Sequence, residues 1–483
     1  MTTLLLRGAA ILSWPCLLCA ASILLAPAPA AEPEYPRLVV DPSGFGKNVQ
    51  RTMRLLATST PEKRNTVRVL FYGQSITEQG WARAVADDLR GRFPHADLVV
   101  ENRALGGFAS QLLVKAAEAD LYPFEPDLVI FHVYGSHDKY EDIIRRVRER
   151  TTAEILQQND HVTKPGDLAE ETDPEKLPPD GAHWDAFMNH NWLPAVSKRY
   201  RTELCDQRAL WKRYLAVNNL EPKALLRDGV HLNAHGEFLM AECVKAYLRY
   251  DPELGPSPAE GWVKTLAVGT DVKWVDGKLR VEFDGTRVDA IRAPKAEGRE
   301  PAPAAVQIDG KKPSEFPGTF ALTRALAEPG GKWPVVAGFG WEEPPVVEDW
   351  TMEVRKDAAD PKAFAFTVSG SVTGPDGSGR SGEKFVSDSG RVVVEPGHWQ
   401  VDYALSLAGV NPVQDAFSVR WEVVSHAVDS FVAPDARDPA AGTAVTLARG
   451  LPPGKHVLEI VGGPDTPIAA IRVHCPPLAG ETK

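Results

Sequence analysis

Short apolar segments alternate with helical patterns in the first half of the chain. Four apolar runs are typical of buried strands, at residues 67–72, 98–102, 128–133 and 154–158. Hydrophobic residues recur at helical spacing in five further segments, near residues 81–93, 110–119, 139–150, 184–218 and 234–249. Strands that alternate with helices usually form a parallel sheet covered on both faces, so we predict an α/β domain over residues 65–250.

The pattern changes after a proline-rich segment at residues 251–261, which we interpret as a linker. Beyond it, apolar and polar residues alternate with a period of two in five segments, at 278–288, 364–368, 391–394, 417–423 and 456–461. Turn residues separate these segments, and residues 369–382 read as one such loop. Alternation of this kind is typical of strands with one buried face. We therefore predict an all-β region of sandwich or jelly-roll type over residues 262–478.

The first thirty residues have the features of a secretory signal peptide, which we place at residues 1–30. Arg7 is their only charged residue, residues 11–25 are largely apolar, and residues 28–30 fit a small-residue cleavage site. This apolar run is too short for a membrane span, and no later stretch is long and apolar enough to form one. We expect an exported protein, periplasmic, at the cell surface or extracellular, with residues 31–64 as an extension before the α/β domain.

The chain carries a formal net charge of −11. Because an acidic chain repels phosphate groups, we do not expect nucleic acid as a partner, and a neutral glycan or a small ester fits better. Three cysteines lie beyond the signal peptide, at Cys205, Cys243 and Cys475. Either Cys205 and Cys243 pair, or all three are unpaired and mostly buried thiols. No group of cysteines and histidines has metal-ligand spacing, so we expect neither a metal nor a cofactor.

Asp228 and His231 form the most informative local motif. They lie three residues apart in a turn that contains glycine and asparagine, just before a helical pattern. In such a turn the carboxylate can accept a hydrogen bond from one ring nitrogen, which leaves the other nitrogen free to act as a base. His235, four residues after His231, is interpreted as a residue at the start of the helix rather than a metal ligand.

Ser75 is the matching nucleophile. It follows the strand at residues 67–72 through Gly73 and Gln74, and a helical pattern begins shortly after it. This order places a hydroxyl at the carboxyl end of a strand and near a helix N-terminus, where N–H groups favour negative charge. The alternative is that Ser75 only caps the following helix. The distant Asp-x-x-His motif favours the nucleophile.

Two further blocks follow the next two strands. Asn102 ends one strand five residues before Gly107, and a Gly-x-x-Asp block at residues 135–138 follows the next. In this order the four blocks resemble the SGNH (GDSL-type) hydrolases over residues 65–250. The resemblance implies a three-layer, flavodoxin-like domain with esterase activity. It also implies roles for single residues: Ser75 as nucleophile, His231 as base, Asp228 as its orienting group, and an oxyanion hole formed by the N–H groups of Ser75 and Gly107 and the side chain at position 137.

The chain departs from the family pattern at two positions. Gln74 stands where the family usually has an aspartate before the serine, as in variants found among sugar acetylesterases. His137 stands where the family has the asparagine of the oxyanion hole. An imidazole can donate to an oxyanion, but its protonation depends on pH in a way that an amide's does not. Three interpretations remain open: His137 donates, another group donates, or the site is weakened or inactive.

Residues 159–183 are polar and proline-rich, and they are predicted to form a long loop over the edge where the parallel strands end. Five residues near this edge are predicted to shape a substrate pocket: Gln74, Asn102, His161, His183 and Trp184. The plainer interpretation is a surface loop whose Trp184 packs on the core. His132 is expected to be a core histidine, and Asp138 either caps the next helix or holds its loop.

Segments near both ends of the β region resemble the jelly-roll modules found beside the SGNH domain in some carbohydrate acetylesterases. They lie at residues 283–288, 306–310 and 447–456. The residues between them, about 325–430, would then be a large insertion or a second sandwich. Five tryptophans of this part could offer a face for stacking sugars, or could simply pack in the core: Trp333, Trp341, Trp350, Trp399 and Trp421.

The sequence therefore predicts an exported serine esterase that hydrolyses small acyl esters, with O-acetyl groups on carbohydrates as the expected substrates. Two alternatives keep the same triad and change the reaction partner: hydrolysis of a lipid or another acyl ester, and transfer of an acyl group to a sugar. A third alternative is a non-catalytic glycan-binding protein that retains a degenerate hydrolase domain.

Overall fold

The computed structural model describes residues 35–179, 184–293, 303–360, 362–433 and 444–480. Residues 37–483 form one compact unit, distinct from residues 1–36. The predicted signal peptide lies outside the described residues. In the described part, no helix is long and apolar enough to cross a membrane. The predicted domain boundaries stay predictions.

A five-stranded parallel sheet organises the first half of the chain. Its strands are arranged in the order β2-β1-β3-β4-β5, namely Asp97–Asn102, Thr66–Gly73, Leu128–His132, Glu154–Gln158 and Glu203–Cys205. The first four are the strands predicted from the apolar runs, and no end is shifted by more than one residue. The central strands β1, β3 and β4 are buried along most of their length, as expected for a parallel sheet covered on both faces. β1 and β3 are accordingly mostly apolar, whereas β4 buries three polar residues, Glu154, Gln157 and Gln158.

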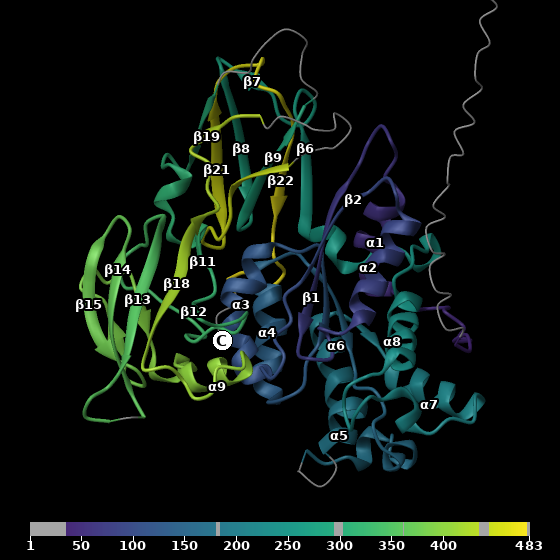
Figure 1. The fold of residues 1–483 in the computed structure, drawn as a ribbon. Coiled ribbons are helices and arrows are strands. Elements are labelled where there is room, and N and C mark those ends of the chain that lie inside the picture. Colours follow the sequence, from purple (N-terminus) through teal and green to yellow (C-terminus); the bar gives the residue numbers. More distant parts are fainter. Residues whose placement is uncertain (1–34, 180–183, 294–302, 361, 434–443, 481–483) are drawn as a thin grey trace, which may run out of the picture. The chain divides into compact units, whose positions relative to one another are not determined.

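Helices cover both faces of this sheet, so the predicted three-layer arrangement is confirmed. They are α1 (Gln50–Ala57), α2 (Gly80–Arg92), α3 (Ser110–Asp120), α4 (His137–Arg150), α5 (Trp184–Phe187), α6 (Leu193–Tyr200), α7 (Gln207–Val217) and α8 (Ala234–Tyr247). One core cluster joins the sheet to α1, α2, α7 and α8, and a second joins it to α3, α4 and α6. Figure 1 shows α3 and α4 on one side of β1 and α1, α2 and α8 on the other.

The single helix predicted over residues 184–218 is wrong. The structure divides this segment into α5, a π-helical turn at Met188–Trp192, α6, the short strand β5 and α7. Arg201 adopts a left-handed conformation (φ 51°) and ends α6, and the side chain of Asp206 accepts from Ala209 N–H at the start of α7. A three-residue edge strand is too short to interrupt the helical spacing of apolar residues, which hid it from the sequence analysis.

The segment predicted as a linker packs against the α/β half. It contains two short 3-10 helices, Pro252–Leu254 and Pro258–Trp262. Ser257 is buried and bonds to Glu154 on β4, and Glu260 receives a bidentate pair of hydrogen bonds from Arg54 at 2.8 and 2.9 Å. Residues 251–261 are therefore anchored rather than free-standing.

Two antiparallel sheets combine strands from the beginning and the end of the β half. One has the order β20-β9-β22-β6, at Ala444–Ala448, Arg287–Arg292, Ile468–His474 and Val263–Ala267. The other has the order β19-β10-β21-β8-β7, at Ser430–Phe431, Ala304–Ile308, Lys455–Val461, Lys278–Asp284 and Trp274–Val275. Apolar residues from both sheets share one core cluster, as the sandwich prediction requires. The predicted strand at 278–288 is two strands, divided by a turn at Gly285.

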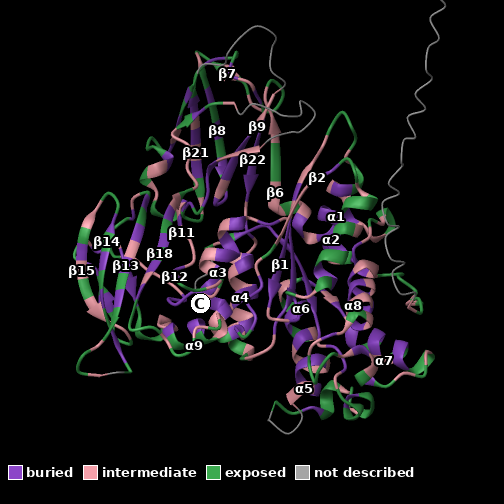
Figure 2. Ribbon diagram, viewed as in Figure 1, coloured by how far each residue is buried: buried purple, intermediate pink, exposed green. Residues whose placement is uncertain are grey.

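A six-stranded antiparallel sheet lies in the chain between β10 and β19. It is built from β11 (Phe320–Leu322), β12 (Leu326–Glu328), β13 (Glu348–Lys356), β14 (Phe364–Gly370), β15 (Gly374–Arg380) and β18 (Ala416–Ser425). A small pair, β16 (Phe385–Val386) and β17 (Val393–Val394), and the helix α9 (Val401–Leu407) share its core. Strands β13 and β14 alternate buried and exposed residues (Figure 2).

One prediction for this part needs correction. The loop expected at residues 369–382 contains β15, whose Gly- and Ser-rich sequence resembles a turn but pairs with β14 through its main chain. Of the two interpretations of the tryptophans, packing in the core holds for Trp350 and Trp421, which are 1% and 2% exposed. Cys205, Cys243 and Cys475 are all unpaired, and the first two are buried.

Candidate active site

Ser75, His231 and Asp228 come together at the carboxyl-terminal edge of the parallel sheet. His231 Nε2 lies 2.9 Å from Ser75 Oγ, and His231 Nδ1 lies 3.0 Å from Asp228 Oδ2. The main-chain N–H groups of Val230 and His231 donate to Asp228 Oδ1 at 2.8 and 2.7 Å. The imidazole therefore bridges a hydroxyl and a carboxylate, which is the arrangement that activates a serine.

The environment of Asp228 keeps its carboxylate charged. Hydrogen bonds from the N–H groups of His231 and Val230 lower the pKa of Asp228 to about 2, with a smaller contribution from the His231 ring. An anionic Asp228 holds the proton of a neutral His231 on Nδ1. The lone pair of Nε2 then faces the hydroxyl of Ser75, which donates to it.

Ser75 lies in a turn between β1 and α2. Thr77 N–H donates to Gln74 O at 2.9 Å, and Gln79 N–H donates to Ile76 O at 3.2 Å. Gly73 permits this turn, because a Cβ there would lie 2.2 Å from Thr77 Oγ1. The N-cap of α2 is Gln79, so the alternative that Ser75 caps this helix is wrong, and α2 begins five residues after Ser75.

Gln79 connects the turn of Ser75 to the turn of His231. Its Oε1 accepts from Leu232 N–H at 3.1 Å, and its Nε2 donates to Leu232 O at 2.9 Å. Asn233 then caps α8 by accepting from the N–H groups of His235 and Gly236, in line with the expected place of His235. No local pattern in the sequence pointed to Gln79, because its partner lies 153 residues away along the chain.

Gln74 and Asn102, both predicted pocket residues, form hydrogen bonds that hold loops. Gln74 Oε1 accepts from Tyr134 N–H at 2.6 Å, which joins the turn of Ser75 to the loop after β3. Asn102 Nδ2 donates to Thr77 O at 2.6 Å, and Asn102 Oδ1 accepts from Ala104 N–H. These contacts position the turn that carries Ser75.

Ser75 and Gly107 were predicted to supply the main-chain N–H groups of an oxyanion hole. Among the residues that the structure describes, neither Ser75 N–H nor Gly107 N–H donates a hydrogen bond. Gly107 has φ +80°, and a Cβ there would lie 3.0 to 3.1 Å from Leu407 and Tyr403. Only glycine fits this turn without strain.

The structure does not bring His137 into contact with the triad. Its ring is stacked between the indoles of Trp184, at 5.0 Å and 6°, and Trp192, at 4.6 Å and 25°. His137 Nε2 is buried and forms no hydrogen bond within the described chain. Burial lowers the pKa of His137, so the ring is neutral near pH 7. Its role as an oxyanion donor stays a prediction.

The residues around His137 fit the interpretation of a surface loop whose Trp184 packs on the core. Trp184 meets Tyr134 edge to face at 4.4 Å, and Asp185 accepts from the Tyr134 hydroxyl. Asp138 interacts with the Ser136 hydroxyl and with Lys139, and so holds the loop before α4. The predicted pocket residue His183 lies outside the described residues.

His161 lies beneath the turn of the triad rather than in an open pocket. It is 1% exposed, and its Nε2 donates to Val230 O at 2.8 Å. Asp160 Oδ1 lies 3.0 Å from His161 Nδ1 and 3.4 Å from His132 Nε2. Burial raises the pKa of Asp160, but the two histidines outweigh this effect and hold it well below its usual range. His132 is buried as expected, yet its Nδ1 forms no hydrogen bond.

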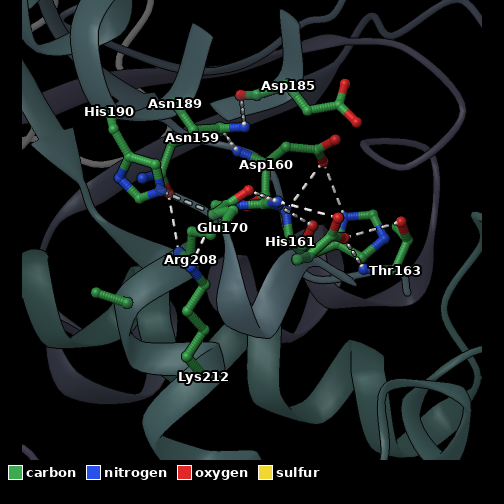
Figure 3. A network of polar contacts seen from close by, with 12 residues as sticks. Asn159, Asp160, His161, Thr163, Glu170, Asp185, Asn189, His190, Arg208 and Lys212 are labelled. Atoms are coloured by element: carbon green, nitrogen blue, oxygen red, sulfur yellow. Dashed lines mark hydrogen bonds and ion pairs between the residues drawn. The ribbon is translucent and has the colours of Figure 1, made fainter. Parts of the chain in front are cut away.

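The loop after β4 is anchored to α7 by a charged network (Figure 3). Glu170 accepts a bidentate pair of hydrogen bonds from Arg208 at 2.6 and 2.7 Å, and it also binds Lys212 and His190. Arg208 in addition donates to His161 O at 2.8 Å. The described part of this loop, residues 159–179, is therefore anchored to α7, and Arg208 positions His161.

The β half contributes residues to the other side of the site. Trp333 Nε1 donates to Gly106 O at 2.8 Å, and the Tyr403 hydroxyl donates to Gly107 O at 2.6 Å. Tyr403 also stacks on Phe108, with ring centroids 6.0 Å apart. Both carbonyls of the Gly106–Gly107 turn thus accept from side chains of the six-stranded sheet region. Sequence patterns gave no signal for these contacts.

Comparison with known proteins shows weak structural similarity. No family model and no curated protein matches the chain. A two-domain esterase active on acetylated mannans is 13% identical, with 89% of this chain and 95% of that chain covered and a TM-score of 0.34. A GDSL-like lipase from Parabacteroides merdae is 19% identical, with 39% and 98% covered and a TM-score of 0.31. An acetylxylan esterase from Geobacillus stearothermophilus is 18% identical, with 39% and 97% covered and a TM-score of 0.32.

Proposed function

We propose that the protein is a serine esterase with Ser75, His231 and Asp228 as its catalytic triad. The observation that carries this proposal is the position of the His231 ring, 2.9 Å from the Ser75 hydroxyl and 3.0 Å from the Asp228 carboxylate. Three side chains that share a hydrogen-bonded line in this order have the geometry of an activated nucleophile and its base.

In this mechanism His231 takes the proton of Ser75 as its oxygen attacks the ester carbonyl. The negative charge that forms on the carbonyl oxygen is stabilised by the free N–H groups of Ser75 and Gly107. His231 then passes the proton to the leaving alcohol, and an acyl-enzyme remains on Ser75. Water, deprotonated by His231, attacks this ester, the acid leaves, and the proton returns to Ser75.

We propose a small acyl group, such as O-acetyl, on a carbohydrate as the substrate. Asp228 and Val230 are 49% and 52% exposed, so the triad opens to solvent and a bulky alcohol such as a sugar can approach it. Tyr403, 41% exposed, offers an aromatic surface next to Gly107 for stacking a sugar ring. Export to the periplasm, cell surface or medium, as proposed from residues 1–30, would place the enzyme near polysaccharides.

The direct test compares the wild type with Ser75→Ala on p-nitrophenyl acetate. We expect hydrolysis by the wild type and by Ser418→Ala, a matched serine variant on the exposed face of β18, but none above background by Ser75→Ala. Equal activity of wild type and Ser75→Ala would refute the triad.

A second experiment identifies the substrate class. We expect p-nitrophenyl esters to be cleaved with falling rates from acetate to octanoate, and acetate to be released from acetylated xylan or mannan. Faster cleavage of the long esters would instead support a lipid substrate. Acyl transfer to an added sugar at the expense of hydrolysis would support a transferase. Cell fractionation with an antibody checks the proposed export.

A further inference from the structure

His132, Asp160 and His161 form a compact group apart from the triad. Each offers one ring nitrogen or carboxylate oxygen, and these three atoms lie within 4.8 Å of one another. His132 ends β3, and the other two residues follow β4, the neighbouring parallel strand. The group therefore lies at the same edge of the sheet as Ser75. Sequence spacing did not reveal it, because its members come together only when β3 and β4 pair.

One ring nitrogen of His161 forms a hydrogen bond and the other does not. Nε2 donates to Val230 O at 2.8 Å, so it carries a proton. Nδ1 lies 3.0 Å from Asp160 Oδ1 but forms no hydrogen bond, although the side chain is buried. Because Nε2 is bound to Val230 O, Nδ1 is the nitrogen of His161 that can coordinate a cation beside the Asp160 carboxylate.

The spacing of the three groups suits a metal ion. Ligand atoms at about 2.1 Å from a tetrahedral Zn²⁺ lie roughly 3.4 Å apart. The two separations that involve Asp160 Oδ1 are 3.0 Å, to His161, and 3.4 Å, to His132. Histidine ligands commonly donate their second N–H to a backbone carbonyl, as His161 does to Val230. The Asp160 side chain is 26% exposed, which leaves a path for the ion and room for a water ligand.

We propose that His132, Asp160 and His161 bind a divalent transition-metal ion such as Zn²⁺. Two imidazole nitrogens and one carboxylate oxygen are a donor set that Zn²⁺ accepts, with a fourth position for water. The ion holds the ring of His161, and through the bond from Nε2 to Val230 O it holds the turn between Asp228 and His231. Its role is structural, and the triad reaction has no step that uses it.

The experiment measures metal bound to purified protein made without a histidine tag. The protein is stripped with a chelator, incubated with ZnCl₂, desalted and analysed by inductively coupled plasma mass spectrometry. We expect about one Zn²⁺ per chain for the wild type. His132→Gln, Asp160→Asn and His161→Gln should each retain less than about a tenth of that amount, and His95→Gln, on an exposed loop, should bind as the wild type.

A measurement on the wild type alone guards against variants that fail to fold. Co²⁺ bound to the stripped protein should show the visible absorption of a site with nitrogen and oxygen ligands, and Zn²⁺ should abolish this absorption and raise the Tm. No retained Zn²⁺ and no Co²⁺ spectrum would overturn the proposal, as would full retention in all three variants. Ser75→Ala should bind Zn²⁺ as the wild type does, so failure of the proposed esterase activity leaves this test intact.

Discussion

The two turns that flank Ser75 are held in different ways. The turn from Asp228 to His231 is held by residues of the α/β half, namely Gln79 through Leu232 and His161 through Val230. The Gly106–Gly107 turn is held by Trp333 and Tyr403, which belong to the β half. The contacts that hold the proposed base are therefore local to one half, whereas the turn of Gly107, the proposed oxyanion donor, is held by residues of the other half. In the proposed mechanism the β half thus supports one of the two oxyanion donors.

The largest loss of activity is expected from a change in the turn from Asp228 to His231, which is held within the α/β half. Asp228→Asn removes the charge that orients the His231 ring, and we expect kcat to fall by about 10³–10⁴ with little change in KM. Steady-state kinetics on p-nitrophenyl acetate measures this loss. Because the pKa of Asp228 is about 2, its carboxylate stays charged above that pH and is neutralised only as the pH falls through about 2. A wild-type activity that required protonated Asp228 would contradict this account.

Gly107→Ala disturbs the Gly106–Gly107 turn, which residues of the β half hold in place. A methyl group there meets Leu407 and Tyr403 at 3.0 to 3.1 Å and requires a left-handed conformation at φ +80°, so the turn must shift. We expect kcat to fall about 10²-fold through misplacement of one oxyanion donor. A circular dichroism melt run beside the kinetics separates this effect from unfolding. Activity within a factor of two of the wild type would remove Gly107 from the oxyanion hole.

Gln79→Ala tests the link between the two catalytic turns. It deletes both hydrogen bonds to Leu232 and frees the turn of His231 relative to Ser75, so we expect a loss of about 10- to 100-fold in kcat. Asn218→Ala is the matched control, since it removes the hydrogen bond that the side-chain amide of Asn218 donates to Tyr214 O at the end of α7. Equal losses in the two variants would show that the effect of Gln79 is on general stability.

The smallest effects should come from the contacts of the β half. Trp333→Phe and Tyr403→Phe each remove one hydrogen bond to the Gly106–Gly107 turn while keeping the ring, and we expect about 3- to 10-fold lower kcat for each. Trp399→Phe loses an equivalent bond, to Glu383 O, within the β half. If Trp399→Phe lowers kcat as much as Trp333→Phe does, the β half acts through its stability and not through the turn.

The sequence predicted the parts of the fold whose signals are local. Strands β1 and β3 are mostly apolar because both faces of a parallel sheet are covered, and the alternation in β14 and β18 follows from one buried face. The edge strands β5 and β15 were missed, because main-chain pairing with one neighbour defines them and their short or Gly-rich sequences carry no pattern of their own. The central strand β13 was missed as well, although its residues do alternate between buried and exposed positions.

The residues of the candidate site likewise fall into those that a local sequence pattern revealed and those that only the fold brings together. Asp228 and His231 contact each other within one turn, so their spacing in the sequence already indicates the pair. Trp333 and Tyr403 reach their carbonyl acceptors across more than 220 residues, and no local pattern can reveal such a contact. The pocket expected from His161 is wrong for a similar reason, because its burial depends on packing against the turn of Val230.

Ser75, as we propose, is an activated nucleophile paired with His231. A fluorophosphonate labels such a serine covalently, and mass spectrometry of the digested chain then locates the adduct. We expect a single adduct, on Ser75, which forms on the wild type and on Ser418→Ala and is lost in His231→Ala. If the wild type forms no adduct, or forms one on another serine, Ser75 is not the nucleophile.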